Sequence, residues 1–261
     1  MTNGNIEARL RRTPALLWAL LATLVACAPA HLPAPEQAQR IVGHQPQGAK
    51  AQGPAMWRID PQQSLIAVTV RRAGTLARLG HDHVVASGDV HGCALQQKLA
   101  SAMVREAHLQ FRLDQLSVDE PALRKRAGFD TQPGQEAIDG TRRNMLVKVL
   151  DAERFPLVSI DAYQRAGGAQ ADAGQVLLAL AITLHGVTRM VDASAAIEGN
   201  ADTITVIGNL QLKQSDFGIT PFSVLGGAIA VADRLDLEYR IVAERQEIPC
   251  TWPRPRHLNG Q

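Results

Sequence analysis

Aromatic residues are scarce in this chain of 261 residues, since tryptophan, tyrosine and phenylalanine together make up 4% of it. An excess of charge of one sign is also lacking. Residues 1–27 hold three of the 27 basic residues and one of the 25 acidic residues, which leaves 24 of each beyond residue 27. A chain without net positive charge has no field to gather nucleic acid. The sequence therefore predicts no nucleic-acid partner.

Sequence patterns that carry catalysis are missing as well. The chain has no G-x-S-x-G elbow and no glycine-rich phosphate loop. Asp216 lies in the segment QSDFGITP, residues 214–221, and is typical of a turn residue, because Ser and Asp side chains hydrogen-bond nearby backbone groups. We predict that the protein is not an enzyme, has no catalytic residue and requires no cofactor.

A short apolar run near the N-terminus predicts export. Three arginines precede residues 14–26, an apolar segment too short for a transmembrane helix, and small residues end it. Residues 24–27, LVAC, resemble a bacterial lipobox, in which the chain is cut before the cysteine and that cysteine, here Cys27, is acylated. An ordinary signal peptide with an incidental Cys27 and a twin-arginine signal are the alternatives. Ala28 follows the cysteine, which in enterobacterial sorting favours the outer membrane.

The composition predicts four parts of the chain. Residues 1–27 are a lipoprotein signal peptide, and residues 28–55, rich in Pro, Ala, Gln and Gly without periodic apolar positions, are a flexible tether. Residues 56–246 form a β-barrel domain, and residues 247–261 are a C-terminal tail. We expect a periplasmic protein attached to the outer membrane by its N-terminal lipid, and a homodimer is compatible with this arrangement.

Two-residue alternation of apolar and polar positions recurs through the domain and predicts strands. The cleanest instance spans residues 101–114. The run VLLALAITL at residues 176–184 is apolar on one face and small or apolar on the other, which predicts a strand with little water on either side. It is broken at His185 and Gly186 and followed by an outgoing strand, which predicts a hairpin. The predicted strands span residues 64–71, 81–92, 101–114, 157–162, 176–184, 187–191, 204–212 and 229–243.

The rhythm changes between residues 117 and 155. Acidic residues before Pro121 predict the start of a helix, and residues 141–152 predict a second helix with an apolar side. About eight strands, a short helical insertion and no βαβ alternation predict an all-β fold, an antiparallel lipocalin-like barrel.

The interior of an eight-stranded barrel is filled by side chains or holds one slender ligand. Alternation alone does not fix which face of each strand points inward. The candidate ligand-binding residues are Val68, Val70, Leu109, Phe111, Leu180, Ile182, His185, Leu210, Phe217, Leu237 and Tyr239.

One cluster has the character of a metal site, at His81-Asp82-His83. On a strand the two histidines share a face, with backbones about 6.6 Å apart, so both rings reach one ion. Two ligands do not complete a zinc site, and His185 or an acid would have to supply a third. Two alternatives are rim histidines that hydrogen-bond loop carbonyls and histidines that contact a ligand's head group.

The two cysteines of the predicted domain and tail, Cys93 and Cys250, allow two interpretations. In an oxidising periplasm they pair and pin the C-terminal tail to the barrel, or they stay free. Their separation in sequence says nothing about their distance in space.

Four segments in order resemble the YceI-like family of periplasmic lipid-binding proteins. They are WRIDPQQSLIAVTV (residues 57–70), LDAERFPLVSI (150–160), LAITLHGVTRMV (180–191) and SDFGI (215–219). The resemblance extends over about residues 56–244 and implies a lipocalin-like antiparallel barrel that holds a long polyisoprenoid chain in its core. It therefore implies a long-chain amphiphilic lipid as the partner.

Three hypotheses follow. The first is a periplasmic carrier that holds an isoprenoid or another long-chain amphiphile. The second is a metal-binding or redox-accessory lipoprotein that uses His81 and His83. The third is a structural barrel that is fully packed and binds no ligand.

Overall fold

The computed structural model describes residues 54–99, 102–129, 131–165, 175–247 and 250, all within the compact unit Ala49–Gln261. Cys27, the predicted signal peptide and nearly all of the predicted tether lie outside these residues. The strands are β1 (Ala55–Ile59), β2 (Leu65–Ala73), β3 (His83–Ser87), β4 (His91–Leu99), β5 (Ala102–Arg112), β6 (Ser117–Val118), β7 (Leu157–Gln164), β8 (Gln175–Leu184), β9 (Val187–Gly199), β10 (Thr203–Lys213), β11 (Ser223–Val224) and β12 (Ile229–Gln246). The helices are α1 (Pro121–Arg126) and α2 (Gln135–Asn144), which a π-helical turn, Met145–Val149, continues.

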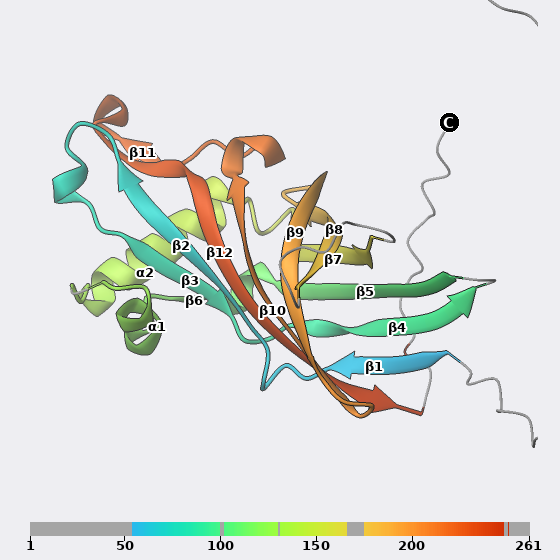
Figure 1. Cartoon of the computed structure of the whole chain (residues 1–261). Coiled ribbons are helices and arrows are strands. Elements are labelled where there is room, and N and C mark those ends of the chain that lie inside the picture. Colours follow the sequence, from blue (N-terminus) through green and yellow to red (C-terminus); the bar gives the residue numbers. More distant parts are fainter. Residues whose placement is uncertain (1–53, 100–101, 130, 166–174, 248–249, 251–261) are drawn as a thin grey trace, which may run out of the picture. The chain divides into compact units, whose positions relative to one another are not determined.

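Eight strands close into an antiparallel barrel in the order β1-β4-β5-β7-β8-β9-β10-β12, and β12 pairs back to β1 (Figure 1). The predicted fold class, an antiparallel barrel of about eight strands with a short helical insertion, is confirmed. Closure gives every strand of the ring two neighbours, so its backbone hydrogen bonds are made within the sheet. A closed ring also encloses an interior that inward-facing side chains line.

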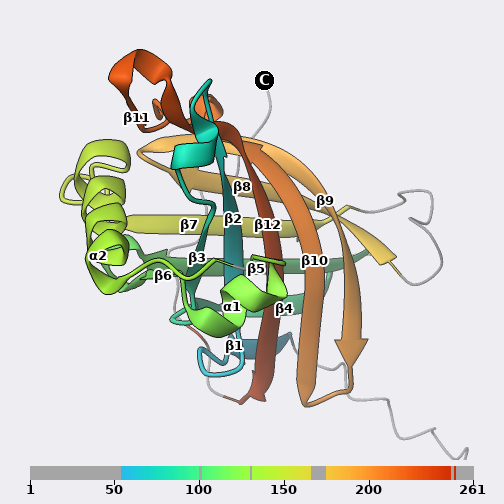
Figure 2. The same cartoon turned by 90° about the vertical axis from the view of Figure 1, so that its left-hand side faces the viewer.

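The longest strand, β12, has two partners along the same edge. Its C-terminal part pairs with β1, where Ile59 lies opposite Ala243, and its N-terminal part pairs with β2, where Ala73 lies opposite Ala230. Strand β3 pairs with β2, and β6 pairs with β3. Strands β2, β3 and β6 thus extend the sheet beyond the ring, toward the side on which α2 lies (Figure 2).

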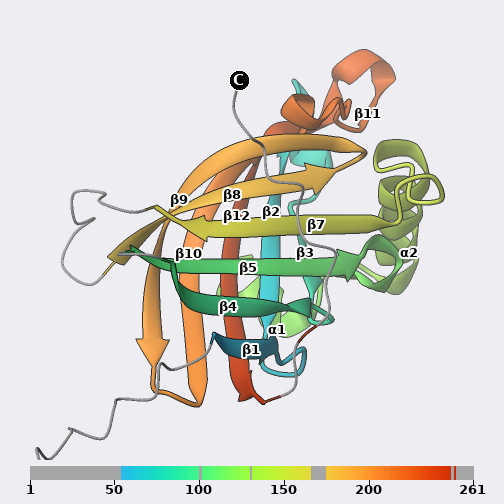
Figure 3. The same cartoon turned by 90° about the vertical axis from the view of Figure 1, so that its right-hand side faces the viewer.

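The two ends of the barrel differ. Helix α2 and the β8–β9 turn lie at one end, which we call the helical end (Figure 3). The β9–β10 connection, residues 200–202, lies at the opposite end, which we call the distal end. At the helical end Met145, Leu150 and Leu184, the last residue of β8, pack against a buried cluster that includes Val158. The helical segment therefore covers the sheet at this end, next to the edge strand β6.

The predicted hairpin is confirmed. Strands β8 and β9 pair in register from Leu184 opposite Val187 onward, and only His185 and Gly186 connect them. Both turn residues have positive φ, 52° and 74°, as a two-residue type I′ turn requires. A Cβ at Gly186 would lie 2.5 Å from Cε1 of Phe155, so glycine is needed for space as well as for conformation.

Three local predictions were wrong. Residues 81–92, predicted as one strand, form β3 and only the start of β4, with residues 88–90 between the two strands. Strand β1 was not predicted, and neither was most of β4, where alanine, glycine and glutamine weaken the alternation. Helix α2 begins at Gln135 rather than residue 141. Its first turns, QEAIDG, expose nearly all side chains to solvent, so no apolar periodicity marks them.

Cys93 and Cys250 form a disulfide with a Cα–Cα distance of 6.3 Å. Of the two interpretations left open by the sequence, the structure has the paired one. Cys93 is buried on β4, so the bond fixes the chain at residue 250 to the barrel wall. Among the described residues, no helix is long and apolar enough to span a bilayer.

Candidate functional site

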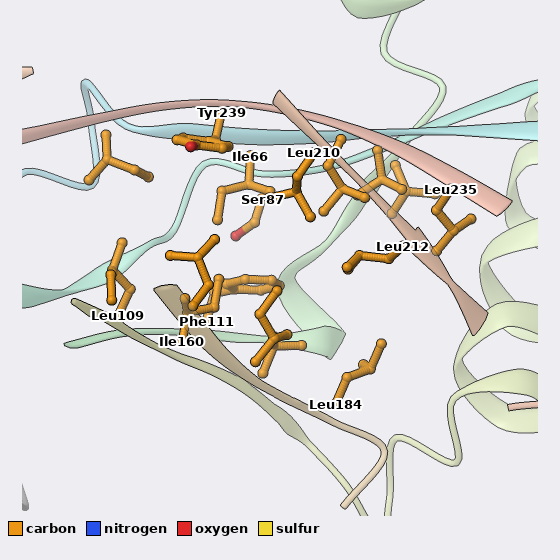
Figure 4. Close-up of a pocket in the computed structure, with 18 of the residues that line it drawn as sticks. Ile66, Ser87, Leu109, Phe111, Ile160, Leu184, Leu210, Leu212, Leu235 and Tyr239 are labelled. Carbon is orange, nitrogen blue, oxygen red and sulfur yellow. The ribbon is translucent and has the colours of Figure 1, made fainter. Parts of the chain in front are cut away.

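A cavity of about 800 Å³ runs through the barrel and is lined mainly by aliphatic side chains (Figure 4). Its volume falls within the range of about 300–1,000 Å³ typical of small-molecule sites. Leu109, Phe111 and Ile160 point into it from one wall, and Leu210 and Tyr239 point into it from the facing wall. The barrel therefore encloses a mainly apolar cavity and is not filled by its own side chains.

Register explains why these side chains share one space. Val68 on β2 lies opposite Leu237 on β12, which in turn lies opposite Leu210 on β10. Directly paired residues in a sheet project to the same face, so these three form one inward row. Leu109 and Ile160, paired between β5 and β7, form the corresponding row on the facing wall.

Most of the predicted ligand-binding residues line this cavity. They are Val68, Val70, Leu109, Phe111, Leu180, Ile182, Leu210, Leu237 and Tyr239. Residues that the prediction omitted include Ile66, Leu212 and Leu235, which occupy the same alternating faces of β2, β10 and β12. The two-residue period would have found all three once the inward face of each strand was known.

Two predicted residues do not line the cavity. His185 occupies the β8–β9 turn, where its ring lies against Phe155 with 4.8 Å between ring centroids. Phe217 is 1% exposed and belongs to a core cluster with Ile182 and Ile219. The turn conformation of His185 directs its ring onto Phe155, and Phe217 is buried in the core cluster. Neither side chain is part of the cavity wall.

The polar residues of the cavity wall gather at its ends. At the distal end Arg105 donates to Gln96 and Gln164 at 2.8 and 2.9 Å, and two acids, Glu106 and Glu198, lie in the same part of the wall. This end therefore carries both signs of charge. Its one lining guanidinium among the described residues is already held by amide oxygens.

The helical end has a different composition. Arg72, His81 and His83 line it, and the centroids of the two imidazoles are 6.4 Å apart. Nη1 of Arg72 donates to the carbonyl of Gly80 at 3.0 Å, which holds the guanidinium beside the histidine segment. Asp82, between the two histidines, points away from the cavity and accepts from the backbone N–H of Arg72 at 2.8 Å.

A buried ionic network supports His83 from behind. Nδ1 of His83 lies 2.6 Å from Oδ2 of Asp119, and Nη1 of Arg124 lies 2.6 Å from Oδ1 of the same carboxylate. The side chains of Asp119 and Arg124 are both completely buried. Arg124 also donates to the carbonyl oxygens of Asp82 and Thr131 at 2.7 and 2.9 Å. The guanidinium thus joins α1 to the loop before β3 and compensates the buried carboxylate.

The charge state of Asp119 determines which atom of His83 is free. Burial raises the pKa of Asp119, but hydrogen bonds from His83, the Val84 N–H and Arg124 outweigh burial and hold that pKa below its ordinary value. An ionised carboxylate only accepts, so Nδ1 of His83 carries the shared proton. Nε2 is therefore the nitrogen of His83 that can bond a molecule in the cavity.

The predicted metal site has no third ligand in the described part of the chain. Among the described residues, no group of three or more histidine, cysteine, aspartate or glutamate side chains is placed to hold an ion. The acid nearest to His83, Asp119, bonds its ring instead, and His185 packs on Phe155 in the β8–β9 turn. Neither donor that the sequence left open for this role completes a site.

Two buried polar atoms in the cavity wall have no hydrogen-bond partner among the described residues, Nε1 of Trp57 and the hydroxyl of Tyr239. Burial raises the pKa of Tyr239, so its hydroxyl stays protonated at neutral pH. The Tyr239 hydroxyl lies against Gly208, where a Cβ would come within 2.3 Å of it. Polar atoms without partners are rare in protein interiors. Both atoms are covered by the protein, so the aromatic rings contribute to the cavity wall and their polar atoms do not face its interior.

The sequence and the fold both match known proteins. Residues 57–243 match the family model for the YceI-like domain. The chain belongs to the YceI-like family. Its barrel is similar to the crystal structure of Burkholderia cenocepacia BcnA, with a TM-score of 0.50 and 14% identity, over 70% of this chain and 98% of that chain.

A second similar solved structure is described as a polyisoprenoid binding domain from Saccharophagus degradans, implicated in plant cell wall breakdown. It is 13% identical, with a TM-score of 0.49 over 73% of this YceI-like chain and 98% of its own. No curated protein matches the sequence. At such identities the structural likeness to BcnA shows the shared fold and nothing finer.

Proposed function

We propose that this YceI-like protein is a binding protein, not an enzyme, that carries an isoprenoid or another long-chain amphiphile in its barrel. The observation that carries the proposal is the cavity of about 800 Å³, whose wall is mainly aliphatic between its polar ends. Moving a hydrocarbon chain from water into such a wall contributes about 0.8 kcal/mol per CH₂ group. A slender chain of many such groups suits an interior of this width and length.

The other two hypotheses have less support. A ligand-free structural barrel was expected to be packed with its own side chains, whereas this barrel encloses a cavity of about 800 Å³. A metal-dependent accessory protein needs a third ligand beside His81 and His83, and the described residues supply none. Lipid binding accounts for the apolar cavity, which neither the structural barrel nor the metal-binding protein explains.

We place the carrier in the periplasm, attached to the outer membrane through acylated Cys27. The support is the lipobox-like sequence LVAC at residues 24–27 and the small residue that follows it. The disulfide between Cys93 and Cys250 suits an oxidising compartment. A tether of the composition of residues 28–55 would let the barrel move relative to the membrane that supplies its ligand.

The test is a variant that fills the cavity. Leu210→Trp adds bulk to the inward row of β10, and Gln211→Trp adds the same side chain at the next, exposed position of that strand. Calorimetric titration with farnesol should give one-site binding to the wild type and to Gln211→Trp, and binding weakened at least about tenfold in Leu210→Trp. Thermal unfolding verifies that all three are folded. Equal affinity in all three would contradict binding inside the barrel.

A further inference from the structure

We infer that the helical end of the barrel docks on the surface of an anionic lipid bilayer through a patch of side chains outside the cavity. The inference rests on the proposed carrier function, because a lipid carrier exchanges its ligand with a membrane. Four exposed apolar and two exposed basic side chains form this docking patch, Leu79, Val147, Val224, Leu225, Arg78 and Lys148. None of the six lines the cavity.

The apolar members of the docking patch stand on three connections at the helical end. Leu79 ends a 3-10 turn between β2 and β3, and Val147 lies in the π-helical turn that continues α2. Val224 ends β11, and Leu225 follows it on the way to β12. Leu79, Val147 and Leu225 are 60%, 69% and 71% exposed. Single exposed apolar residues are ordinary on a protein surface, whereas a group of neighbouring ones marks an interaction site.

The three connections lie next to one another. The N–H of Leu76 donates to the carbonyl of Ala228 at 2.7 Å, so the β2–β3 connection lies against the β11–β12 connection (Figure 1). Nζ of Lys148 lies 5.7 Å from the ring centroid of Phe222, which joins the π-helical turn to the segment before β11. Gly80 and Phe222 themselves line the cavity. The docking patch therefore borders the helical end of the cavity on the outside.

The backbone at Leu225 has no explanation within the fold. Its φ is 52°, and Gly226 and Gly227 follow with φ of 64° and 91°. The left-handed region is unfavourable for a residue with a Cβ, so glycine or asparagine would suit this tip better than leucine. Burial does not compensate the strain, because the side chain of Leu225 projects into solvent. A partner that covers this side chain would account for a leucine at the tip.

The charge of the connections indicates which partner fits. They contain four basic residues and no acid over residues 71–81, 145–149 and 221–231. Asp82 pairs with Arg71 and Arg72 at 3.4 and 3.9 Å, whereas Arg78 and Lys148 have no ion-pair partner among the described residues. Apolar side chains beside unpaired basic ones match the interface of an anionic bilayer, where hydrocarbon lies beneath negatively charged head groups. A bilayer bound here faces the end of the cavity, so a ligand can pass between the two.

The experiment measures flotation with lipid vesicles, using residues 28–261 exported behind a cleavable signal peptide so that the disulfide forms. Because Cys27 is absent, no lipid anchor contributes to binding. The wild type should float with vesicles of equal parts phosphatidylcholine and phosphatidylglycerol, and severalfold less with phosphatidylcholine alone. The double variant Leu79→Ser/Leu225→Ser should bind the anionic vesicles at least about tenfold more weakly. Arg78→Gln/Lys148→Gln should bind them severalfold more weakly and lose the preference for phosphatidylglycerol.

Matched controls remove the same kinds of side chain elsewhere. Met190→Ser/Ile207→Ser removes two exposed apolar side chains from β9 and β10, outside the cavity lining. Arg58→Gln/Arg245→Gln removes two exposed basic side chains from β1 and the C-terminal part of β12. Both double variants should float like the wild type, and thermal unfolding verifies that every variant is folded.

A fluorescent reporter tests which part of the protein meets the bilayer. Tryptophan in Leu225→Trp should be quenched by brominated lipids in anionic vesicles, because its ring enters the interface. Gln211→Trp places the same side chain at an exposed position of β10 and should gain no quenching. Equal quenching in the two variants would contradict docking through this patch.

The outcomes separate docking from ligand binding. Flotation that is equal in the wild type and in Leu79→Ser/Leu225→Ser would overturn the docking inference. Self-association that this variant abolishes, with flotation unchanged, would also overturn it and assign the patch to a second copy of the chain. A wild type that binds farnesol but no vesicles would overturn docking and leave the carrier proposal in place. Flotation that depends on the patch, without binding of farnesol, would support docking and contradict the carrier.

Discussion

Asp119 accepts a hydrogen bond from Nδ1 of His83 at 2.6 Å, although 36 positions separate the two residues in the chain. His83 begins β3 at the helical end of the cavity, and Asp119 follows β6 in a left-handed conformation with φ of 57°. Pairing of β3 with β6 brings them together, and the N–H of Asp119 bonds the carbonyl of Val84 at 2.8 Å. The extension of the sheet beyond the ring thus serves to position a side chain of the cavity wall.

Removing the guanidinium of this network should destabilise the fold strongly. Arg124→Met leaves Asp119 buried without its charge partner, and we expect a loss of about 3–5 kcal/mol in the free energy of unfolding. The matched control is Arg126→Met, two residues on, which breaks an ion pair to Glu238 whose side chains are 61% and 63% exposed. That change should cost about 0–1 kcal/mol. Urea unfolding measures both, and similar losses would contradict the structural role of the buried pair.

Acid should weaken the same network. Folding lowers the pKa of Asp119, so the unfolded chain binds more protons at this residue than the folded chain does. The contribution of the Asp119 carboxylate to the free energy of unfolding is therefore present above about pH 4. That contribution is lost as the pH falls through the lower pKa of the folded state. The difference in unfolding free energy between the wild type and Asp119→Asn should therefore shrink as the pH is lowered from neutral to below about 4. A difference that stays constant over this interval would show that Asp119 is not ionised in the fold.

The β8–β9 turn should tolerate no side chain at its glycine. Gly186→Ala places a residue at φ of 74° and its Cβ within 2.5 Å of Phe155, so both strain and collision oppose it. Gly128 has nearly the same φ, 75°, and a Cβ added there would meet nothing within 4 Å. Gly128→Ala should cost about 1–2 kcal/mol from strain alone, and Gly186→Ala should cost clearly more. Equal losses in thermal or urea unfolding would show that Phe155 moves aside.

The hydroxyl of Tyr239 should be dispensable for stability in the empty barrel. It is buried without a partner among the described residues, so Tyr239→Phe removes a desolvated polar atom and keeps the ring. We expect the free energy of unfolding to be unchanged or to rise by up to about 1 kcal/mol. Unfolding of delipidated protein tests this. A loss of more than about 1 kcal/mol would mean that the hydroxyl makes a bond in solution, for instance to a bound water.

The sequence was sufficient for the barrel and for most of its inward wall, because both follow from a two-residue period. Val68, Leu210 and Leu237 repeat in strands whose pairing then places them in one row. The same period could not show that His185 lies outside the cavity wall, because the turn directs its side chain onto Phe155. Local pattern predicts the face of a strand, and the conformation of a turn is decided by contacts outside that pattern.

Long-range contacts account for what the sequence did not show at the helical end. The pattern marked His81 and His83 as a pair of interest but offered metal binding as one use for them. Nothing near Asp119 or Arg124 in the sequence indicates that both are buried, since charged residues before and within a short helix are ordinarily exposed. Their role appears only when β6 pairs with β3 and carries α1 against the loop at Asp82.

The most direct test of a lipid-carrying barrel is native mass spectrometry of the unit Ala49–Gln261, secreted to the periplasm and purified without detergent. The lipid-binding account predicts an adduct of several hundred daltons that organic solvent extracts, and that is much reduced in Leu210→Trp but retained in Gln211→Trp. A bare protein mass, or a mass raised only by a metal ion, would contradict it.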